Sequence, residues 1–423
     1  MSDADAAPRA GSALGARLPR LVSLWRDRGT RKPGSAAGKR APFDEGAAPS
    51  LSRTEIESVG AALLRLQRGL TGKRGLAGAP YMDDPDLLGA YLLYYWPVSY
   101  AEASLAIAEL ALRPRRVLDL GSGPGPAAAA AIDMGADEAI LMDGSERALE
   151  LASRLLKRDG VRVATSCVDL ESADALSKES GPFDLVILGH SLNELWRERD
   201  DRVERRTELL ERAARLLSPG GALLAIEPAL LETSREALAL RDALAARDHR
   251  ILGPCPARAS GPYRCPALAS GPDRTCHSEA AWEAPEPVAS LAAQAGLDRR
   301  SVKYAWFAAG AASVGAGTAA PLDARPAAWT AAQRADAESI EGRVVSDSML
   351  NKAGRVRYFI CSEGSLVSLS AARTAPGARA AGFFSLRRGD RVRVRGAEQR
   401  AGGGLGLVPG SSLGILARAP EIG

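Results

Sequence analysis

Glycines and carboxylates between residues 117 and 143 have the types and spacing that could hold a ligand. Residues 117–120 (VLDL) form a short apolar run typical of a buried parallel strand, and a glycine loop, residues 121–125 (GSGPG), follows at once. Glycines let such a backbone turn tightly and let a ligand approach where a Cβ would block it. The pattern then predicts a helix over 127–134 and a strand over 139–142. Asp143 follows that strand, 22 residues beyond the first glycine, where a carboxylate would meet ribose hydroxyls.

The glycine loop is poorly suited to a phosphate. Pro126 stands where the dinucleotide fingerprint needs a third glycine or alanine, and Pro124 and Pro126 remove backbone N–H donors that a phosphate would use. The spacing instead resembles the GxGxG loop of class I S-adenosylmethionine (SAM) methyltransferases, whose ligand has no phosphate. That resemblance implies cofactor contacts from the loop and from strand ends; the aromatic segment 91–100 could in addition lie over the mouth of the cofactor pocket or, as the alternative, pack in the core. The residues are Asp119, Gly121, Ser122, Gly123, Gly125, Asp143, Asp169 and, as the lid, Tyr100.

Further strands of the same parallel sheet are predicted over 160–167, 183–188 and 222–226. In class I methyltransferases the acid after the third strand, here Asp169, hydrogen-bonds the adenine amino group. Ligands in open α/β sheets bind beyond the carboxyl ends of strands, so the segment that follows the fourth strand faces the reaction zone. His190 and Asn193 in that segment are the candidate catalytic residues. No Asn/Asp-Pro-Pro-aromatic motif for methylating an exocyclic amine follows the fourth strand.

Four cysteines lie in or beside segments with little predicted secondary structure. Cys255, Cys265 and Cys276 fall in a Pro/Gly-rich loop, 253–278, and Cys361 follows a strand-like run. A loop so poor in apolar periodicity needs a cross-link to be ordered, and four thiolates at one centre would supply it. The C-x9-C-x10-C spacing lacks the paired C-x2-C knuckles of a zinc ribbon, so the set suits a [4Fe–4S] cluster or an all-cysteine zinc site. Unrelated free thiols are the alternative.

The composition excludes several classes of protein. The 423 residues are 46% hydrophobic and 25% charged, which is ordinary for a chain with one α/β domain and accessory domains. No apolar run is long enough to cross a bilayer and no secretory signal is present, so we expect no membrane association. Five cysteines, an odd number, indicate a reducing compartment. We expect a monomer in the cytoplasm, with the mitochondrial matrix as the alternative, and a buried Cys167.

Five segments are predicted along the chain: a disordered basic arm (1–50), a helical region (51–115), a class I methyltransferase domain with the cysteine loop (116–311), a linker (312–338) and a small basic β module (339–423). The arm carries nine Lys/Arg against one acid between residues 9 and 40 and could lie on nucleic acid or merely add solubility. The fold class is α/β: a Rossmann-like SAM-methyltransferase domain with N-terminal helices and a C-terminal β-barrel-like module.

Short apolar alternations separated by turns recur in the last segment and favour a β-barrel. Basic residues suited to a phosphate backbone are interleaved with them: Lys352, Arg355, Arg357, Arg387, Arg388, Arg391, Arg393 and Arg395. A solvated strand face without RNA would carry the same pattern.

Several stretches together resemble the methyltransferase-like family of mitochondrial small-ribosomal-subunit assembly proteins and their bacterial relatives. The matching pieces are residues 91–100 (YLLYYWPVSY), 117–125, 190–195 (HSLNEL), Glu227-Pro228, the cysteine series and 344–361 (VVSDSMLNKAGRVRYFIC). The resemblance implies a class I fold, SAM binding, an iron–sulfur cluster on the four cysteines, and association with the small ribosomal subunit and its rRNA. The first three cysteines are further apart here than in that family.

Two functions stay open on the sequence alone. The first is a SAM-dependent methyltransferase acting on small-subunit rRNA, indicated by the glycine loop with Asp143 and Asp169. The second is a catalytically silent assembly factor that keeps the SAM fold as a scaffold and binds rRNA with its basic surfaces. The missing catalytic motif and the basic flanks indicate this second function.

Overall fold

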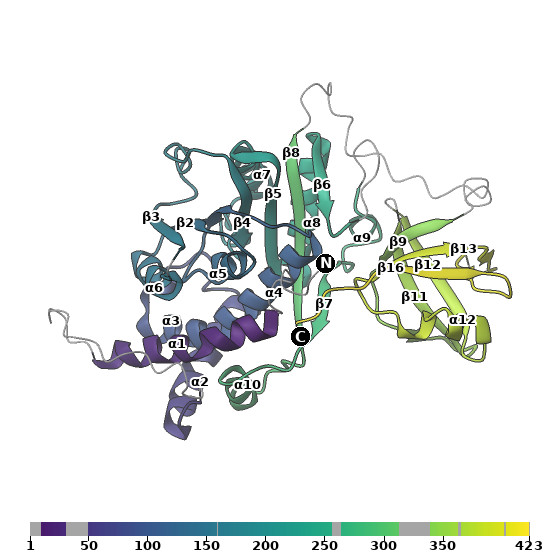
Figure 1. Ribbon diagram of the computed structural model, residues 1–423, viewed down its shortest axis with the longest axis horizontal. Helices are drawn as coiled ribbons and strands as arrows, with labels where there is room; N and C mark the ends of the chain where they lie inside the picture. The colour runs from purple at the N-terminus through teal and green to yellow at the C-terminus, as the bar shows by residue number, and fades with distance from the viewer. Residues whose placement is uncertain are drawn as a thin grey trace. The chain divides into compact units, whose positions relative to one another are not determined.

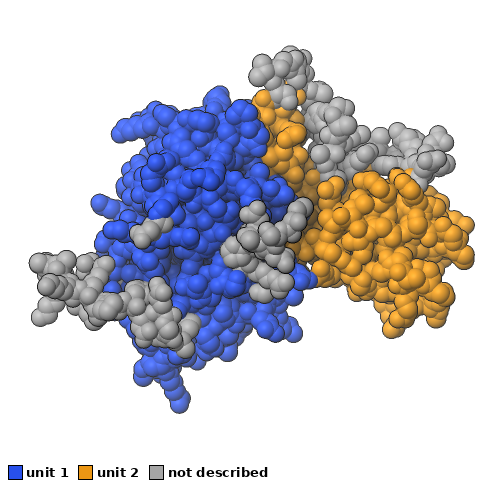
Figure 2. Space-filling model, viewed as in Figure 1, with its two compact units in different colours: residues 1–227, 281–302, 421–423 blue, residues 228–280, 303–420 orange. Residues whose placement is uncertain are grey.

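The computed structural model describes residues 10–30, 50–158, 160–255, 264–312, 339–362, 365–401 and 403–422. The chain divides into two compact units (Figure 2): unit 1 is residues 1–227, 281–302 and 421–423, and unit 2 is residues 228–280 and 303–420. The predicted linker lies outside the described residues except for residue 312. None of the helices in the described ranges is long and apolar enough to cross a membrane.

Unit 1 contains a parallel sheet and the helices packed on it. Its helices are α1 (Ala10–Thr30), α2 (Arg53–Gln67), α3 (Pro85–Ala90), α4 (Trp96–Glu109), α5 (Pro126–Asp133), α6 (Glu146–Leu156), α7 (Arg202–Ala214) and α10 (Val288–Ala295), with short turns η2 (Arg68–Gly72), η3 (Tyr81–Asp83) and η4 (Tyr91–Tyr95). Its strands are β1 (Arg116–Leu120), β2 (Glu138–Asp143), β3 (Arg162–Cys167), β4 (Phe183–Gly189) and β5 (Leu217–Pro228).

The five strands pair in parallel in the order β3-β2-β1-β4-β5 (Figure 1). The order reverses between β1 and β4, which places a topological switch point at the carboxyl end of β1. Helix α5 lies against β1, β2 and β4, and α6 lies against β2 and β3. Val117, Leu118 and Leu185 are fully buried, as expected for central parallel strands. The α/β class I fold expected from the sequence is confirmed.

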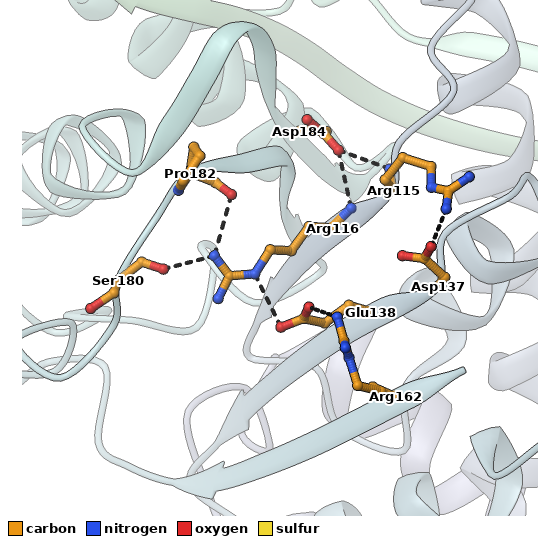
Figure 3. Close-up of polar contacts among 8 residues, drawn as sticks. All are labelled: Arg115, Arg116, Asp137, Glu138, Arg162, Ser180, Pro182 and Asp184. Carbon is orange, nitrogen blue, oxygen red and sulfur yellow. Dashed lines mark hydrogen bonds and ion pairs between the residues drawn. The ribbon is translucent and has the colours of Figure 1, made fainter. Parts of the chain in front are cut away.

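Charged side chains join the strands at the opposite, amino-terminal edge of the sheet (Figure 3). Asp184 Oδ2 accepts the backbone N–H groups of Arg115 and Arg116 at 2.9 and 3.1 Å. Glu138 accepts from Arg116 at 3.0 Å and from Arg162 at 2.7 Å. The starts of β1, β2, β3 and β4 are thereby tied together, and the carboxyl edge is left for a ligand.

Residues 10–30 form helix α1, so the disordered arm predicted there is wrong for this segment. Four apolar side chains with helical spacing are buried on one stripe: Leu14, Leu18, Leu21 and Val22. The helix contacts α4, and Arg17 makes two hydrogen bonds of 2.7 Å to Asp133 at the end of α5. The rest of the predicted arm, 1–9 and 31–49, lies outside the described residues.

Asp133→Ala should release α1 and destabilise unit 1. The carboxylate accepts from Arg17, Arg158 and the Tyr100 hydroxyl, and its side chain is only 11% exposed. Removing one partner of a largely buried pair leaves the other charge uncompensated, so we expect a loss of about 3 kcal/mol in denaturant unfolding and earlier proteolysis within α1. Asp137→Ala is the matched control, because its pair with Arg115 is exposed and should be worth less than about 1 kcal/mol. Equal losses in both variants would contradict the prediction.

Unit 2 contains an antiparallel pair, β6 with β8, on which β7 also pairs, and a separate curled sheet. Its elements are α8 (Leu231–Ala246), β6 (His249–Gly253), α9 (Pro266–Ala269), β7 (Ser278–Ala281), β8 (Ser301–Ala312), β9 (Ile340–Val344), β10 (Met349–Leu350), β11 (Arg355–Ser362), β12 (Ser365–Ala372), α12 (Pro376–Ala380), η5 (Phe383–Ser385), β13 (Arg391–Arg395), β14 (Glu398–Gln399), β15 (Leu405–Gly406) and β16 (Ser412–Ala417).

The curled sheet is the expected β module. Strand β9 pairs with β11 and β13, β11 pairs with β12, and β13 pairs with β16, all antiparallel. Two strands of the segment 405–417 close the sheet on itself. Strand β15 pairs in parallel with β12, and β16 pairs antiparallel with β13. Tyr358, Ile360 and Phe383 fill its core. Five main strands in this order, with α12 between β12 and β13, have the connectivity of an OB-fold barrel.

Candidate functional site

The glycine loop lies at the carboxyl edge of the unit 1 sheet, between β1 and α5. Gly121, Gly123 and Gly125 have φ values of 67°, 51° and 76°, which L side chains rarely adopt. A Cβ on Gly121 would lie 2.4 Å from Ser191 Cβ, and one on Gly125 would lie 2.9 Å from a leucine of β2, so packing requires both glycines. A Cβ on Gly123 would meet only Met82 Cε, at 3.5 Å. Gly123 is therefore the glycine that a ligand can approach.

Two carboxylates flank the loop. Asp143 accepts the N–H of Gly123 and that of Ser145, each at 2.8 Å, so it ties the loop to the start of α6. Asp119 is 1% exposed; its Oδ2 accepts the Ala128 N–H at 3.0 Å, and its Oδ1 has no hydrogen-bond partner among the described residues. Burial raises the pKa of Asp119 to about 7, with a further contribution from the charge of Asp143. Burial also raises the pKa of Asp143. An unpaired buried carboxylate oxygen favours a donor or a cation beside it.

Two glutamates extend this acidic region past the carboxyl ends of β4 and β5. Glu227 is 2% exposed; its Oε1 accepts the Asn193 N–H at 3.2 Å, and its Oε2 is unpartnered within the described ranges. Glu194 accepts the Gly78 N–H at 3.2 Å and the Tyr81 hydroxyl at 3.4 Å. Burial raises the pKa of each glutamate to about 7. The charges of Glu227 and Asp143 raise the pKa of Glu194 further. The carboxylates therefore share one region of low dielectric constant.

His190 follows β4 with a φ of 61°, and its N–H donates to the Ile226 carbonyl at 2.7 Å. Its Nε2 lies 2.7 Å from Oε2 of Glu102, which is 4% exposed on α4. Burial acts to lower the pKa of His190, but the charge and hydrogen bond of Glu102 outweigh it and raise the pKa above its ordinary value. A carboxylate thus orients the imidazole at the edge where ligands bind, and the ring can hold or accept a proton there.

Asn193, the second catalytic candidate, is engaged by the protein itself. Its Nδ2 donates to the His190 carbonyl at 2.9 Å, and its Oδ1 accepts from Arg74. Its backbone carbonyl accepts from Arg206, a guanidinium that is 1% exposed, at 3.3 Å. These contacts hold the turn that carries His190, so the geometry gives Asn193 a positioning role.

Tyr100, the predicted lid, is not brought to the loop. Its hydroxyl donates to Asp133 at 2.7 Å at the far end of α5, and its ring stacks on Trp96 with 5.5 Å between centroids. Trp96 does reach the loop, because its Nε1 donates to the Pro124 carbonyl at 3.0 Å. The tyrosine on which the site acids act is Tyr91: burial raises its pKa, a hydrogen bond with Ser99 lowers it, and the charges of Glu194, Asp143 and Asp119 raise it further. The aromatic segment therefore contributes Trp96 and Tyr91.

The remaining predicted cofactor residues lie close to the loop. Ser122 is 5% exposed, and its hydroxyl donates to the Gly123 carbonyl at 3.4 Å. Asp169 is exposed just after β3, the strand that pairs with β2, and its Oδ1 accepts the Glu171 N–H at 2.9 Å. The end of β3 therefore brings Asp169 beside the end of β2, where Asp143 lies.

The four cysteines of the predicted metal centre converge within unit 2. Burial raises the pKa of Cys265 to about 12, with further increases from Cys255 and Cys276. Burial and then Cys255 raise the pKa of Cys276 to about 11, and burial and then the other three thiols raise that of Cys361 well above its usual range. Thiols that act on one another in this way lie in one neighbourhood. In the part of the chain that the structure describes, no three Cys, His, Asp or Glu side chains are grouped closely enough to hold a metal ion.

Cys167 is exposed, so the prediction that it is buried is wrong. It lies on β3, the last strand of the unit 1 sheet order, which pairs with β2 alone among the described strands. Its Sγ contacts the Gly144 carbonyl at 3.5 Å.

Sequence reasoning missed Glu102 and Glu194 as site residues and noted Glu227 only in the Glu227-Pro228 piece that matches the family. One signal was available for Glu102, because it is the single charged residue in the apolar stretch 96–108. A lone charge in such a stretch needs a partner when the helix is buried. Its partner, His190, is 88 residues away in sequence.

Solved structures similar to this chain include several methyltransferases. A putative RNA methyltransferase, PH1948 from Pyrococcus horikoshii, is 13% identical with a TM-score of 0.32, covering 50% of this chain and 83% of that one. The ribosomal protein L11 methylase from Lactobacillus delbrueckii subsp. bulgaricus is 20% identical with a TM-score of 0.27, covering 37% and 72%. The plantazolicin methyltransferase BpumL in complex with SAH is 12% identical with a TM-score of 0.30, covering 61% and 98%. A search of curated proteins gave no match.

The family described as mitochondrial small ribosomal subunit Rsm22 matches residues 88–367. The matched region includes the glycine loop, the His190 turn and Cys255, Cys265, Cys276 and Cys361. It covers more than half of the 423 residues. The chain therefore belongs to the Rsm22 family.

Proposed function

We propose that the protein binds SAM at the glycine loop and acts on the small ribosomal subunit as a methyltransferase-like protein. Two unpartnered buried oxygens, Asp119 Oδ1 and Glu227 Oε2, carry the SAM part of the proposal. SAM brings a sulfonium, an ammonium group and ribose hydroxyls, and cations and donors are what these oxygens favour. The family description supports the small-subunit part.

Each residue of the site has a proposed role. Asp143 would hold the ribose hydroxyls, Asp169 would meet the adenine amino group, and Asp119 would face the cationic end of SAM. When bound, SAM supplies the methyl group. His190, oriented by Glu102, would hold or accept a proton of the methyl acceptor.

Transfer of labelled methyl groups from SAM to immature small ribosomal subunits tests this proposal. His190→Ala should lower the transfer rate by about 10²- to 10⁴-fold, the usual loss for a general acid or base. Tyr100→Phe is the matched control, because the structure places this ring away from the loop, and it should keep the wild-type rate. An unchanged rate in His190→Ala would remove this site assignment.

A second candidate function is a catalytically silent assembly factor. The observation that favours it is the engagement of the Asn193 amide by Arg74 and His190, which leaves His190 as the one predicted catalytic group facing the site. This function requires salt-sensitive binding to the small subunit that survives the loss of SAM binding. Abolished subunit binding in a folded Gly123→Asp variant would contradict it.

We also infer that the four cysteines hold a metal centre, a [4Fe–4S] cluster rather than zinc. Their convergence in unit 2 supports a shared centre. The C-x9-C-x10-C spacing lacks the paired C-x2-C knuckles of a zinc ribbon, and the resemblance to the small-ribosomal-subunit assembly family implies a cluster on these four cysteines. Two buried cations interact with Cys361: Arg241 is 0% exposed and Arg343 is 5% exposed. The charge of Arg241 acts to lower the pKa of Cys361, and the charge of Cys361 acts to raise the pKa of Arg343. Buried cations of this kind suit an anionic cluster.

The compartment is inferred from the cysteines and from the family description. Thiolate-held clusters require reducing conditions, which the cytoplasm and the mitochondrial matrix both provide. The family description favours the matrix. That the protein is a monomer stays a prediction.

Glu102→Gln should lower the pKa of His190, because the variant removes the charge that raises it. The protein has three histidines, so a ring-proton NMR titration can follow each one. A pKa that is higher in the folded than in the unfolded state contributes stability below the unfolded value, about 6.5. This contribution is lost as the pH rises through the folded pKa. The variant should therefore lose stability mainly at low pH; a titration of His190 identical to wild type would contradict the prediction.

A further inference from the structure

Strand β11 presents a mixed basic and aromatic face on the outside of the barrel. Tyr358 and Ile360 are each 1% exposed and belong to the barrel core. Side chains alternate along a strand, so Arg355, Arg357 and Phe359 lie on the other face. Phe359 is partly exposed there, opposite Ser368 of β12.

Arg357 and Phe359 form a stacked pair. The Arg357 Cζ lies 5.0 Å from the centroid of the Phe359 ring. The Nε of Arg357 is buried and has no hydrogen-bond partner in the described ranges, and a terminal nitrogen makes only a 3.9 Å contact with the Met349 sulfur. Aromatic rings and guanidinium planes are the surfaces on which unpaired bases stack.

Two cations, Arg355 at the start of the same strand and Arg400 just after β14, form the other part of this face. A Cβ on Gly406 would lie 2.7 Å from Arg400 Cδ and 3.3 Å from a terminal nitrogen of Arg355, so the two arginines border one small space. Burial and then the charge of Arg400 lower the pKa of Arg355. Arg355 donates to the hydroxyl and carbonyl oxygens of Ser370 at 3.3 and 3.1 Å. Two like charges held this close favour an anion beside them.

We propose that this face of β11, together with Arg400, binds single-stranded RNA: a base stacks on Phe359 and Arg357, and a nearby phosphate lies between Arg355 and Arg400. Arg355 and Phe359 are about 13 Å apart along the strand, a span that a short extended run of nucleotides bridges. Strands β11 and β12 are the second and third strands of the barrel, the face that OB-folds use for oligonucleotides. The site rests on the proposed link to ribosomal RNA and adds that the RNA is unpaired.

Fluorescence anisotropy with the full chain tests the stacking part, using a short unstructured oligouridine and an RNA duplex of equal length as probes. Phe359→Leu should weaken oligouridine binding about 5- to 150-fold, the usual loss of one stacked base, and should leave duplex binding unchanged. Phe384→Leu is the matched control, because that ring also lies near an arginine, at 6.0 Å, but packs edge-on against Phe383 after α12. Wild-type binding by Phe359→Leu, or an equal loss in the control, would overturn the site.

The salt dependence tests the phosphate part. Arg355→Ala and Arg400→Ala should each reduce the slope of log affinity against log salt by the amount that one phosphate contact contributes. Arg393→Ala should leave the slope unchanged, because that arginine pairs with Glu341. An unchanged slope in both variants would overturn the phosphate contact. Methyl transfer to small subunits is measured in parallel. If methyl transfer occurs but oligouridine binding does not depend on Phe359, only this RNA site is refuted. If oligouridine binding depends on Phe359 but no methyl transfer occurs, only the methyltransferase proposal is refuted.

Discussion

SAM affinity should increase with pH through about pH 7 and level off above it. Burial raises the pKa of Asp119 and of Glu227 to about 7, so the ligand-free site is partly protonated in neutral solution. The cations of SAM favour the ionised acids, and binding must therefore release protons below pH 7. Each carboxylate that ionises on binding adds about tenfold in affinity per pH unit. About one pH unit above these pKa values both acids are fully ionised, so the affinity levels off there.

Isothermal titration calorimetry in buffers of different ionisation enthalpy measures the protons released directly. Asp119→Asn should reduce the slope of log affinity against pH by up to one, because the amide can still accept from the Ala128 N–H but cannot titrate. Asp169→Asn is the matched control: this carboxylate is exposed, so its variant should lower affinity equally at every pH. An affinity that is constant between about pH 5 and pH 8 would show that these acids do not face the cofactor.

The same acids have an opposite effect on the ligand-free protein. Their pKa values are higher in the folded state than in the unfolded chain, where carboxylates titrate near 4. Their contribution to stability is complete below about pH 4 and is lost as the pH rises to about 7. With SAM bound as proposed, stability of the site would be exchanged for affinity toward a cation, which would explain why carboxylates without full partners persist in a buried place.

The parts of the site that could be predicted from the sequence are those set by local backbone chemistry. The glycine loop, Asp143 and the strand that ends at it are separated by few residues, so a β-strand, a turn and a helix fix their positions. His190 could be predicted because the ends of parallel strands meet at one edge. The pairing of Glu102 with His190 could not, because only the packing of α4 beside the end of β4 brings the two side chains together.

Tyr100 and α1 show two ways in which local patterns mislead. Tyr91 and Tyr100 are nine residues apart, about two and a half helical turns, so the crowding of aromatic residues in this segment does not tell which ring reaches the site. Residues 10–30 are rich in Ala, Gly and Arg, and this composition obscured the stripe that starts at Leu14. Tertiary packing and the ion pair of Arg17 with Asp133 stabilise that helix, and neither is visible in composition.

The four candidate metal ligands could be chosen from the sequence, but their proximity in the folded chain could not be predicted from it. Three come from one loop, and Cys361 lies on a strand that is 85 residues beyond Cys276. The folding of unit 2 alone brings the fourth thiol to the others. This long-range closure is also why a metal there would have a large effect, since it would join the loop to the barrel within one unit.

Cys265→Ser should remove the metal and destabilise unit 2, whereas Cys167→Ser should change neither. Cys265 is buried, the charges of Cys255 and Cys276 act on it, and serine is a poor ligand for iron or zinc, so one substitution opens the proposed centre. Cys167 lies in unit 1 and is exposed, which makes it a matched control for the loss of one thiol. Iron, sulfide and zinc are measured on protein purified without oxygen, together with the visible spectrum. We expect about four irons and four sulfides per wild-type chain and per Cys167→Ser chain, and almost none in Cys265→Ser.

The midpoint of thermal unfolding distinguishes a metal centre that stabilises unit 2 from one that does not. Structural zinc contributes about 10–16 kcal/mol of apparent binding energy in small peptides, and a loss of only about 3 kcal/mol would lower the midpoint of a unit this size by roughly 6–12 °C. Cys265→Ser should show a shift of this order and Cys167→Ser should not. Stoichiometric zinc in place of iron would keep the four-thiol centre and refute the cluster. Metal-free wild-type protein whose midpoint is unchanged by Cys265→Ser would refute the centre, and the thiols would then be buried side chains that stay protonated because burial raises their pKa values.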